Sequence, residues 1–382
     1  MFKRDLVLPT NSFLLFGPRS TGKSTWLGEK LPDAIKIDLL SNREFLSFFN
    51  NPSLLQQIVQ NAPINKWIVI DEIQKIPALL DEVHKAMYES QGKRKFALTG
   101  SSARKIKRSN GNMLAGRALT RNLFPLTLNE LDGALSLESI LKYGTLPIIS
   151  SQKDTEIKAD FLESYVSTYM KEEIQQEALV KKLDSFSRFL EVMAILNGQI
   201  LNVSNVASNA KVARTTINGY IEILCDTLLG YLLPSWRPKH KVKEINHPKF
   251  YFFDTGVIRT ISGKLRDSLD SEERGRLFET LIVNELKATN SYKKLGAEFF
   301  YWKTADGAEV DLIMKVGKKI LGFEIKSTDS WKSKYSKNLN QMAEEGIITK
   351  AFGVYTGKYS LKDDRVTVIP YTDLVSTILN VL

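Results

Sequence analysis

Short apolar runs alternate with amphipathic stretches over residues 1–150 of the chain. The apolar runs predict buried strands at Phe13–Phe16, Ala34–Asp38, Trp67–Ile70 and Phe96–Thr99. Helical spacing is found between strands, at Pro52–Gln60 and Ala78–Glu89. Strands that alternate with helices are typical of a parallel sheet with helices on both faces. We therefore expect residues 1–150 to form an α/β domain of this kind.

A helical pattern follows after residue 150. The polar segment Asp154–Leu183 predicts a connecting helical region. Three further helices are expected at Phe186–Leu196, Val203–Ala210 and Ala213–Thr227. The last two have the spacing of a helix-turn-helix, and Leu228–Trp236 and Lys249–Asp254 could pair as the strands of a wing. We expect a winged-helix-like domain over residues 151–236, a kind of module that serves protein packing as often as DNA binding.

The remaining region, residues 237–382, combines a helix with a hairpin of strands. An amphipathic helix is expected over Gly275–Leu286. Strands are expected at Phe299–Lys303, Glu309–Met314 and Ile320–Lys326. A turn at Gly317-Lys318 would join the last two strands as a hairpin. A smaller α/β domain is therefore predicted, which makes three domains in total.

A complete phosphate-loop motif, G-x-x-x-x-G-K-[ST], follows the first strand directly. The expected phosphate-binding residues are Gly17, Pro18, Arg19, Ser20, Thr21, Gly22, Lys23, Ser24 and Thr25. The glycines let the backbone curl so that successive N–H groups point at a phosphate, and the helix that follows adds its dipole. Lys23 is expected to contact the β- and γ-phosphate oxygens and Ser24 to bind Mg²⁺. The motif predicts ATP and Mg²⁺ as cofactors.

Two carboxylates end the apolar strand at Trp67–Ile70. We expect Asp71 to hold Mg²⁺ through water and Glu72 to polarise the water that attacks the γ-phosphate. An exposed acidic turn is the alternative for a lone Asp-Glu pair. That alternative is less common about fifty residues after a phosphate loop.

Two further residues are candidates for sensing the γ-phosphate. Ser101 follows the strand at Phe96–Thr99, whose carboxyl end faces the nucleotide crevice in a parallel sheet. Arg117 is a candidate for contacting the γ-phosphate or a neighbouring subunit. A small polar turn at Ser101 and a surface ion pair at Arg117 are the alternatives. Phosphate contacts at both residues would let the nucleotide state reposition the later domains.

The order of these motifs resembles that of prokaryotic AAA-type ATP-binding proteins. The motifs are the phosphate loop, the strand ending in Asp71-Glu72, Leu98-Thr99-Gly100-Ser101-Ser102, Leu114-Ala115-Gly116-Arg117 and Phe124-Pro125-Leu126-Thr127. The resemblance runs over nearly the whole chain and implies ATP binding. It also implies a C-terminal domain of unknown function that is similar to the restriction-endonuclease superfamily. Because AAA-type domains often form rings, a homo-oligomer is compatible with the resemblance.

A second group of charged residues lies in the C-terminal region. Asp311 and Glu324 fall on adjacent strands of the predicted hairpin, and Lys326 shares a strand face with Glu324. With Glu279 from the helix, these residues resemble the D…E-x-K core of restriction-endonuclease-like nucleases. The carboxylates would hold Mg²⁺ against a scissile phosphate, and Lys326 would activate water or stabilise charge. One alternative is that these residues are solvated charges on the strands. Another is that the domain keeps the nuclease-like fold without the activity, as such folds also do.

Composition and charge narrow the class of protein. Hydrophobic residues make up 43% of the chain, and neither a signal peptide nor an apolar stretch near 20 residues is present, so we expect a cytoplasmic protein without a membrane partner. The single cysteine, Cys225, lies among apolar residues and is expected to pack as a small hydrophobic side chain. The spacing of the three histidines does not match that of a zinc site. The net charge of +10 suits a polyanion such as DNA. Basic residues gather at 104–108, 237–243 and 332–337.

We therefore hypothesise an ATP-hydrolysing AAA-type protein that acts on DNA, with a nuclease-like C-terminal domain. A nucleotide-dependent switch or scaffold that binds protein partners, with a silent C-terminal domain, is the alternative. A kinase of small molecules fits less well, because the region after the phosphate loop is long and basic.

Overall fold

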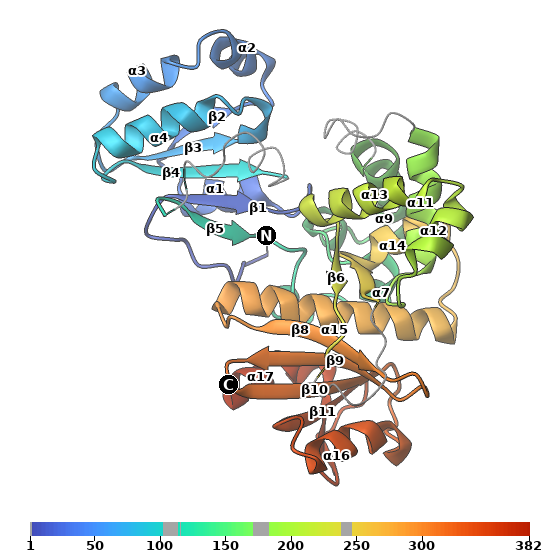
Figure 1. The fold of residues 1–382 in the computed structure, drawn as a ribbon. Coiled ribbons are helices and arrows are strands. Elements are labelled where there is room, and N and C mark those ends of the chain that lie inside the picture. The colour runs from blue at the N-terminus through green and yellow to red at the C-terminus, as the bar shows by residue number, and fades with distance from the viewer. Residues whose placement is uncertain (1, 102–113, 115, 171–182, 238–246) are drawn as a thin grey trace.

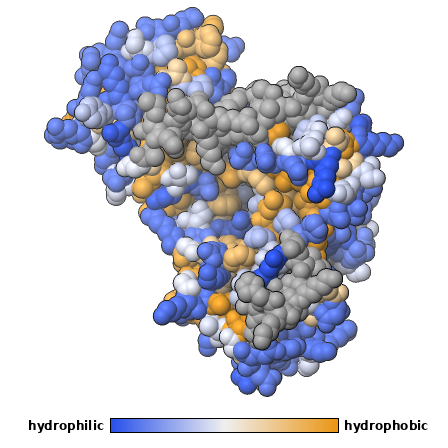
Figure 2. All heavy atoms as spheres, in the orientation of Figure 1, coloured by the Kyte–Doolittle hydropathy of each residue, from blue (hydrophilic) through white to orange (hydrophobic). Residues whose placement is uncertain are grey.

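The computed structural model describes residues 2–101, 114, 116–170, 183–237 and 247–382. Figure 1 shows three groups of elements: an N-terminal sheet with its helices, a cluster of helices beside it, and a C-terminal sheet below. On the face drawn in Figure 2, hydrophilic residues predominate on the two outer lobes, apart from a hydrophobic group at the tip of the upper one, and further hydrophobic residues lie in the middle between the lobes. Among the described residues, no helix has the length and apolar character needed to cross a bilayer.

The N-terminal sheet is wholly parallel, with strand order β2-β3-β4-β1-β5. Its strands are β1 (Phe13–Phe16), β2 (Ile35–Asp38), β3 (Trp67–Asp71), β4 (Lys95–Gly100) and β5 (Leu119–Asn122). Its helices are α1 (Lys23–Lys30), α2 (Asn42–Asn50), α3 (Leu54–Asn61), η1 (Ile73–Lys75) and α4 (Leu79–Glu89). These elements confirm the predicted P-loop NTPase fold class.

Alternate residues of β1 face opposite sides of this sheet, as the period of a strand requires. Leu14 and Phe16 pack in a core with residues of α2, α3 and α4. Phe13 and Leu15 pack in a second core with Trp26 of α1. Both faces are therefore covered by helices, which explains why the strand is apolar at every position.

The middle of the chain is mostly helical. Its elements are α6 (Leu128–Leu131), α7 (Leu137–Tyr143), α8 (Pro147–Ser150), α9 (Thr155–Ser164), η3 (Tyr165–Met170), α11 (Leu183–Ile195), α12 (Val203–Ala210), α13 (Arg214–Asp226), β6 (Gly230–Leu233), β7 (Lys249–Phe252) and α14 (Thr255–Ile261). The three predicted helices of the helix-turn-helix region are present, and β6 pairs with β7 in antiparallel fashion.

The C-terminal sheet is mixed, with strand order β12-β13-β11-β10-β9-β8. Its strands are β8 (Glu298–Lys303), β9 (Glu309–Val316), β10 (Lys319–Lys326), β11 (Lys350–Tyr355), β12 (Leu361–Asp363) and β13 (Val366–Pro370). Its helices are α15 (Ser271–Lys293), η4 (Ser333–Ser336), α16 (Lys337–Glu344), η5 (Tyr371–Asp373) and α17 (Leu374–Val381). The turn at Gly317-Lys318 joins β9 and β10 as predicted.

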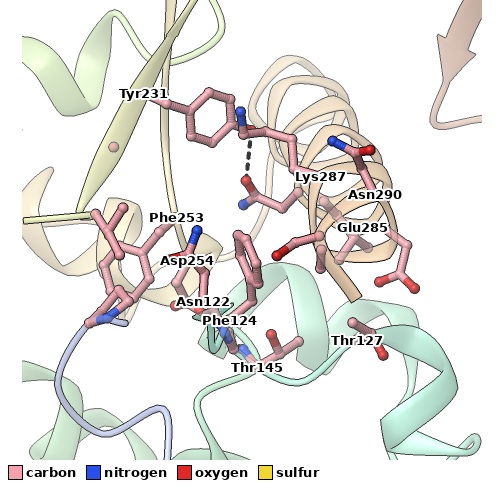
Figure 3. A pocket seen from close by; sticks show the side chains of 18 of the residues that line it. Asn122, Phe124, Thr127, Thr145, Tyr231, Phe253, Asp254, Glu285, Lys287 and Asn290 are labelled. Atoms are coloured by element: carbon pink, nitrogen blue, oxygen red, sulfur yellow. Dashed lines mark hydrogen bonds between the residues drawn. The ribbon is translucent and has the colours of Figure 1, made fainter. Parts of the chain in front are cut away.

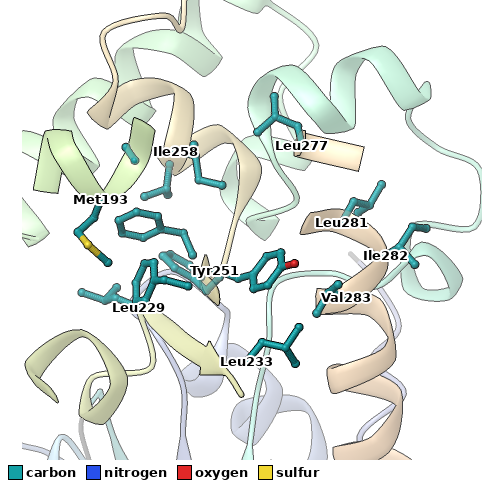
Figure 4. Packing of buried hydrophobic residues seen from close by; sticks show 14 of the residues in the cluster. Met193, Leu229, Leu233, Tyr251, Ile258, Leu277, Leu281, Ile282 and Val283 are labelled. Atoms are coloured by element: carbon teal, nitrogen blue, oxygen red, sulfur yellow. The ribbon is translucent and has the colours of Figure 1, made fainter. Parts of the chain in front are cut away.

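One apolar core extends from the helical region into the C-terminal sheet. Figure 4 shows part of it, where residues of α11, β6, β7 and α14 meet α15. Residues on β10 and β11, such as Phe323 and Phe352, belong to the same cluster. The predicted domain boundaries at residues 150 and 236 stay a prediction. The helical region shares one core with the C-terminal sheet, which also packs a second cluster that includes Ile313 and Leu339.

The long helix α15 also reaches the N-terminal sheet. Ala288 and Tyr292, near its C-terminal end, pack in the core that contains Phe13 and Trp26. Glu285 accepts a hydrogen bond at 2.9 Å from the backbone N–H of Leu128. A single helix thus contacts all three parts of the molecule, which makes it a mechanical link between them (Figure 1).

Candidate functional site

The phosphate loop has the curled backbone that the motif predicts. Gly22, which precedes α1, has φ +89°, and Ser20 has φ +63°, so two residues of the loop adopt the left-handed region. A Cβ atom on Gly17 would lie 2.3 Å from the carbonyl oxygen of Leu123. Glycine at position 17 is therefore required for close approach, and glycine at position 22 for conformation.

Lys23 is buried inside this curl. Its Nζ atom donates to the carbonyl oxygens of Gly17, at 2.7 Å, and Pro18, at 3.1 Å. The hydroxyl of Thr21 also donates to Pro18, at 2.8 Å. The ammonium group is thus held at the mouth of α1, whose N-terminal dipole favours an anion at the same place.

Ser24 and Asp71 come together across the end of the sheet. The Ser24 hydroxyl donates to Asp71 Oδ2 at 2.5 Å. Thr99, on β4, donates to the other oxygen of Asp71 and accepts from the backbone N–H of Glu72 at 3.0 Å. A hydroxyl and a carboxylate oxygen are ligands that suit Mg²⁺, so these residues fit the ion that the phosphate loop implies.

Glu72 lies next to this pair in a strained backbone conformation, with φ +59°. Its side chain is buried and accepts a hydrogen bond from the amide of Gln74. The same Gln74 amide lies 3.2 Å from the hydroxyl of Ser101. The structure thus connects Ser101, on one strand end, to Glu72 on the next through Gln74, a residue that the sequence analysis did not single out.

Arg4 is a second residue that the sequence did not reveal. It is buried, and its guanidinium donates to the carbonyl oxygen of Thr21 at 2.7 Å and to the hydroxyl of Tyr292 at 3.1 Å. Its Nε atom lies 3.0 Å from a carboxylate oxygen of Glu130. Arg4 therefore ties the phosphate loop to α15, and a lone arginine outside the motif gives no sequence signal for that role.

A cavity of about 840 Å³ opens beside the loop. Its walls include Phe2, Ser20, Gly22, Thr25, Leu135, Pro147, Ile148, Ser151 and Lys158. The loop forms one side of this cavity, and helices of the region after the sheet form the other. Burial lowers the pKa of Lys158, whose ammonium also lies 5.5 Å from the ring centre of Tyr143. The cavity has the volume of a nucleoside site and the phosphate loop at its edge.

Arg117 does not lie near the phosphate loop. It precedes β5, whose first residue, Leu119, pairs with Phe13 at the start of β1. The phosphate loop follows the other end of β1, so the two lie at opposite edges of the sheet. The guanidinium of Arg117 instead lies over the ring of Tyr88, 5.7 Å from its centre. Arg117 is therefore not placed to contact a γ-phosphate bound by its own chain, and its contact with a neighbouring subunit stays a prediction.

The charged residues of the C-terminal region form a network with lysines at its centre. Lys326 lies 2.7 Å from Glu324 Oε1 and 3.1 Å from Asp311 Oδ2, which also accepts the backbone N–H of Ile325 at 2.8 Å. Lys249 lies 3.1 Å from Glu279 and 2.9 Å from Glu309. We call these six side chains the acid–lysine network: Lys249, Glu279, Glu309, Asp311, Glu324 and Lys326.

Burial raises the pKa values of two acids of this network. It raises the pKa of Glu324 to about 8, with Asp311 adding to the rise and Lys326 opposing it. It also raises the pKa of Glu279, against the attraction of Lys249. In the part of the chain that the structure describes, no three Asp, Glu, His or Cys side chains are grouped to hold a metal ion. The expected metal centre of Glu279, Asp311 and Glu324 is therefore not formed as a three-ligand site.

The start of α13 is available at the surface. Lys211, Arg214, Thr215 and Asn218 are exposed, so the residues expected to contact bases in a helix-turn-helix are accessible. Lys332, Lys334 and Lys337 are also exposed. The basic residues Arg104, Lys105, Lys107, Arg108, Lys239, Lys241 and Lys243 lie outside the described residues.

Comparison with known proteins assigns the N-terminal region. Residues 10–132 match the family model described as an AAA domain. Residues 135–268 and 274–374 match two domains of unknown function, DUF8612 and DUF4143. An uncharacterized protein of Mycobacterium tuberculosis is 24% identical over 375 residues, covering 95% of this chain and 81% of the relative. Another, of Methanocaldococcus jannaschii, is 23% identical over 319 residues, covering 75% and 69%.

Among solved structures, the ADP form of the ORC2 protein of Aeropyrum pernix is 12% identical, with a TM-score of 0.34. The match covers 67% of this chain and 89% of that one. The family match, the parallel sheet and the phosphate loop together identify an AAA-type P-loop ATPase domain at the N-terminus.

Proposed function

We propose that this protein binds and hydrolyses ATP with Mg²⁺ and uses the cycle to act on DNA. The ATPase part of this proposal rests on three chemical groups that lie together at one end of the sheet. These are the Lys23 ammonium within the loop, the Ser24–Asp71 pair at 2.5 Å, and Glu72 beside it. Together they supply phosphate binding, ion binding and a base.

Each group has a role in this proposal. Lys23 exchanges its contacts with loop carbonyls for contacts with phosphate oxygens. Ser24 and Asp71 hold the Mg²⁺ ion, which neutralises phosphate charge. Glu72 orients the water that attacks the γ-phosphate, and Gln74 fixes the direction of its carboxylate. Because Gln74 also contacts Ser101, a phosphate near Ser101 would alter the position of Glu72.

The nucleoside occupies the cavity of about 840 Å³ in this proposal. Its walls belong to the ATPase domain on one side and to α8, α9 and the segments near them on the other. Nucleotide binding would therefore close these two parts on each other. Such closure is how we expect the ATPase cycle to reach the helix-turn-helix region, which follows in the chain.

The DNA part of the proposal rests on charge and exposure. The net charge of +10 favours a polyanion. The helices α12 and α13 follow each other with the spacing that predicts a helix-turn-helix. Lys211, between the two helices, and Arg214, at the start of α13, are exposed. These residues would contact phosphates and position α13, while Thr215 and Asn218 lie where base edges would be read.

DNA affinity should fall as salt concentration rises, and the double variant Lys211→Gln/Arg214→Gln should show a shallower fall. Each lost phosphate contact reduces the slope of log affinity against log salt by about 0.9. Fluorescence anisotropy of labelled duplex DNA over a salt series measures the slope. The control is Lys318→Gln/Lys362→Gln, which removes the same charge from exposed positions of the C-terminal sheet. Equal slopes in both double variants, or no DNA binding at low salt, would favour the protein-scaffold alternative.

For the C-terminal domain we propose a role without DNA cleavage. The observation that favours it is that Lys326 contacts both Asp311 and Glu324, and Lys249 contacts Glu279. Each of these carboxylates thus has a lysine of the same chain within ion-pair distance. In this proposal the acid–lysine network holds α15 and β7 to the hairpin of β9 and β10.

Purified protein should therefore leave supercoiled, linear and branched DNA intact with Mg²⁺ or Mn²⁺, with and without ATP. Gel electrophoresis over several hours measures cleavage. Cleavage by the wild type that disappears in Asp311→Asn, while ATP hydrolysis continues in that variant, would overturn this role. It would instead assign Asp311, Glu324 and Lys326 to a nuclease site.

A further inference from the structure

A second cavity, of about 500 Å³, lies between the ATPase domain, the wing strand β6 and α15. It is separate from the cavity beside the phosphate loop, since Leu126 alone among the described residues lines both. Its walls are mostly apolar and include Leu123, Phe124, Leu233, Phe253, Leu281 and Phe299. Figure 3 shows labelled residues from all three elements around the space. An apolar cavity of this size with few polar groups is the usual form of a small-molecule site.

Lys287 is the cationic group among the described residues that line this cavity. Its Nζ atom lies 3.9 Å from the ring centre of Tyr231 and 5.7 Å from that of Phe299, two residues that also line the cavity. Among the described residues, no carboxylate lies within 4.0 Å of this nitrogen. Burial lowers the pKa of Lys287 to about 8, which reflects the cost of a cation held away from water.

The two carboxyl groups that line the cavity have other partners. Glu285 accepts the backbone N–H of Leu128 at 2.9 Å, and burial raises its pKa to about 8. Asp254 accepts the backbone N–H groups of Thr145, at 2.8 Å, and Val257, at 3.1 Å. Both acids therefore accept hydrogen bonds from nearby backbone N–H groups. Lys287 is the cation that would attract an anionic ligand.

We propose that this cavity binds a small molecule with an apolar body and one carboxylate, which pairs with Lys287. A single carboxylate matches the single ammonium group, and the apolar body matches the leucine and phenylalanine walls. A cationic ligand would meet repulsion from Lys287. A ligand with two or more negative charges would bury at least one without a partner.

The position of the cavity suggests what such a ligand would influence. Pro18 lines it, and the carbonyl oxygen of Pro18 accepts hydrogen bonds from Lys23 and Thr21. Leu123, another wall residue, is the residue whose carbonyl oxygen approaches Gly17. An occupant therefore contacts the back of the phosphate loop. Binding itself does not depend on the function proposed above.

The test compares octanoate with octan-1-ol, which has the same tail without the charge, by isothermal titration calorimetry. We expect wild-type protein to bind octanoate about tenfold or more tightly than octan-1-ol, as a charge-assisted contact provides. Lys287→Met should lose this preference while still binding octan-1-ol. Lys318→Met removes an exposed lysine and should keep the preference. Equal affinity for the two probes in the wild type, or an unchanged preference in Lys287→Met, would overturn the proposal.

A second measurement uses wild-type protein and so does not depend on the folding of a variant. Cys225 is the only cysteine in the chain and lines this cavity. Octanoate at saturation should slow its alkylation by N-ethylmaleimide, followed by mass spectrometry, by about tenfold more than the same concentration of octan-1-ol. Alkylation at the same rate with and without octanoate would place the probe elsewhere and overturn the assignment.

Discussion

Lys23→Ala greatly weakens ATP binding, whereas Glu72→Gln keeps binding and stops turnover. The first change removes the ammonium group that the phosphate loop holds within its curl. Hydrogen bonds to charged groups contribute about 1.5–3 kcal/mol each, so we expect affinity to fall by about 10- to 100-fold or more. The second change keeps the shape of the side chain but removes its charge. We expect hydrolysis to slow by about 10²- to 10⁴-fold, as for loss of a general base.

Nucleotide titration with a fluorescent ATP analogue measures the first effect, and phosphate release measures the second. Lys30→Ala, at the exposed end of α1, is the matched control for Lys23 and should change neither quantity. Gln74→Leu should resemble Glu72→Gln in part, because it removes the hydrogen bond that directs the carboxylate. Loss of binding to the same degree in the Lys23 and Glu72 variants would contradict the separation of phosphate binding from water activation.

The sequence predicted β1, β3 and β4 of the ATPase sheet well because these strands are buried along most of their length, whereas the polar and more exposed β5 was not predicted. A strand buried on both faces is apolar at every position, and the predicted run at Phe13–Phe16 coincides with β1. Ser24, Asp71 and Glu72 could also be placed, since the carboxyl ends of parallel strands meet at one edge. The local motif therefore carried enough information for the fold and for bringing Ser24 and Asp71 together, while their role in binding phosphate and Mg²⁺ stays a prediction.

Arg117 shows where a local pattern fails. An arginine after a glycine-containing loop has no marker for the edge of the sheet at which it lies. That edge depends on the parallel pairing of β5 with β1, which places Leu119 beside Phe13. The roles of Arg4 and Gln74 were missed for a similar reason. Their partners, Tyr292 and Ser101, are distant in sequence and come near only when the chain folds.

The C-terminal residues were placed correctly on their elements, but their chemistry was not predictable. Asp311 and Glu324 do lie on adjacent strands, and Lys326 does contact Glu324. The decisive residue is Lys249, on β7, which lies outside the predicted motif and contacts Glu279. A pattern of carboxylates along the sequence therefore could not reveal that lysines contact them in the folded chain.

Lys249→Met should destabilise the protein strongly if the acid–lysine network is structural. The side chain of Lys249 is only 4% exposed and contacts Glu279 at 3.1 Å and Glu309 at 2.9 Å. Removing one partner of a buried ion pair leaves an uncompensated charge, which costs about 3–5 kcal/mol. Chemical denaturation measures this loss. The control is Lys315→Met, whose partner Glu298 is exposed, and it should cost about 0–1 kcal/mol.

The loss in Lys249→Met should also depend on pH and on Glu279. Burial raises the pKa of Glu279 in the folded protein, and loss of Lys249 removes the attraction that opposes this rise. A carboxyl group with a raised folded pKa is protonated more readily in the folded than in the unfolded state. The variant should therefore be least impaired at acidic pH and lose stability as pH rises through the folded pKa. Adding Glu279→Gln removes the unpaired charge and should restore much of the stability at neutral pH. If the double variant is as unstable as Lys249→Met at every pH, the lysine acts through packing alone, and Glu279 is free to serve the metal-dependent chemistry that the sequence motif predicts.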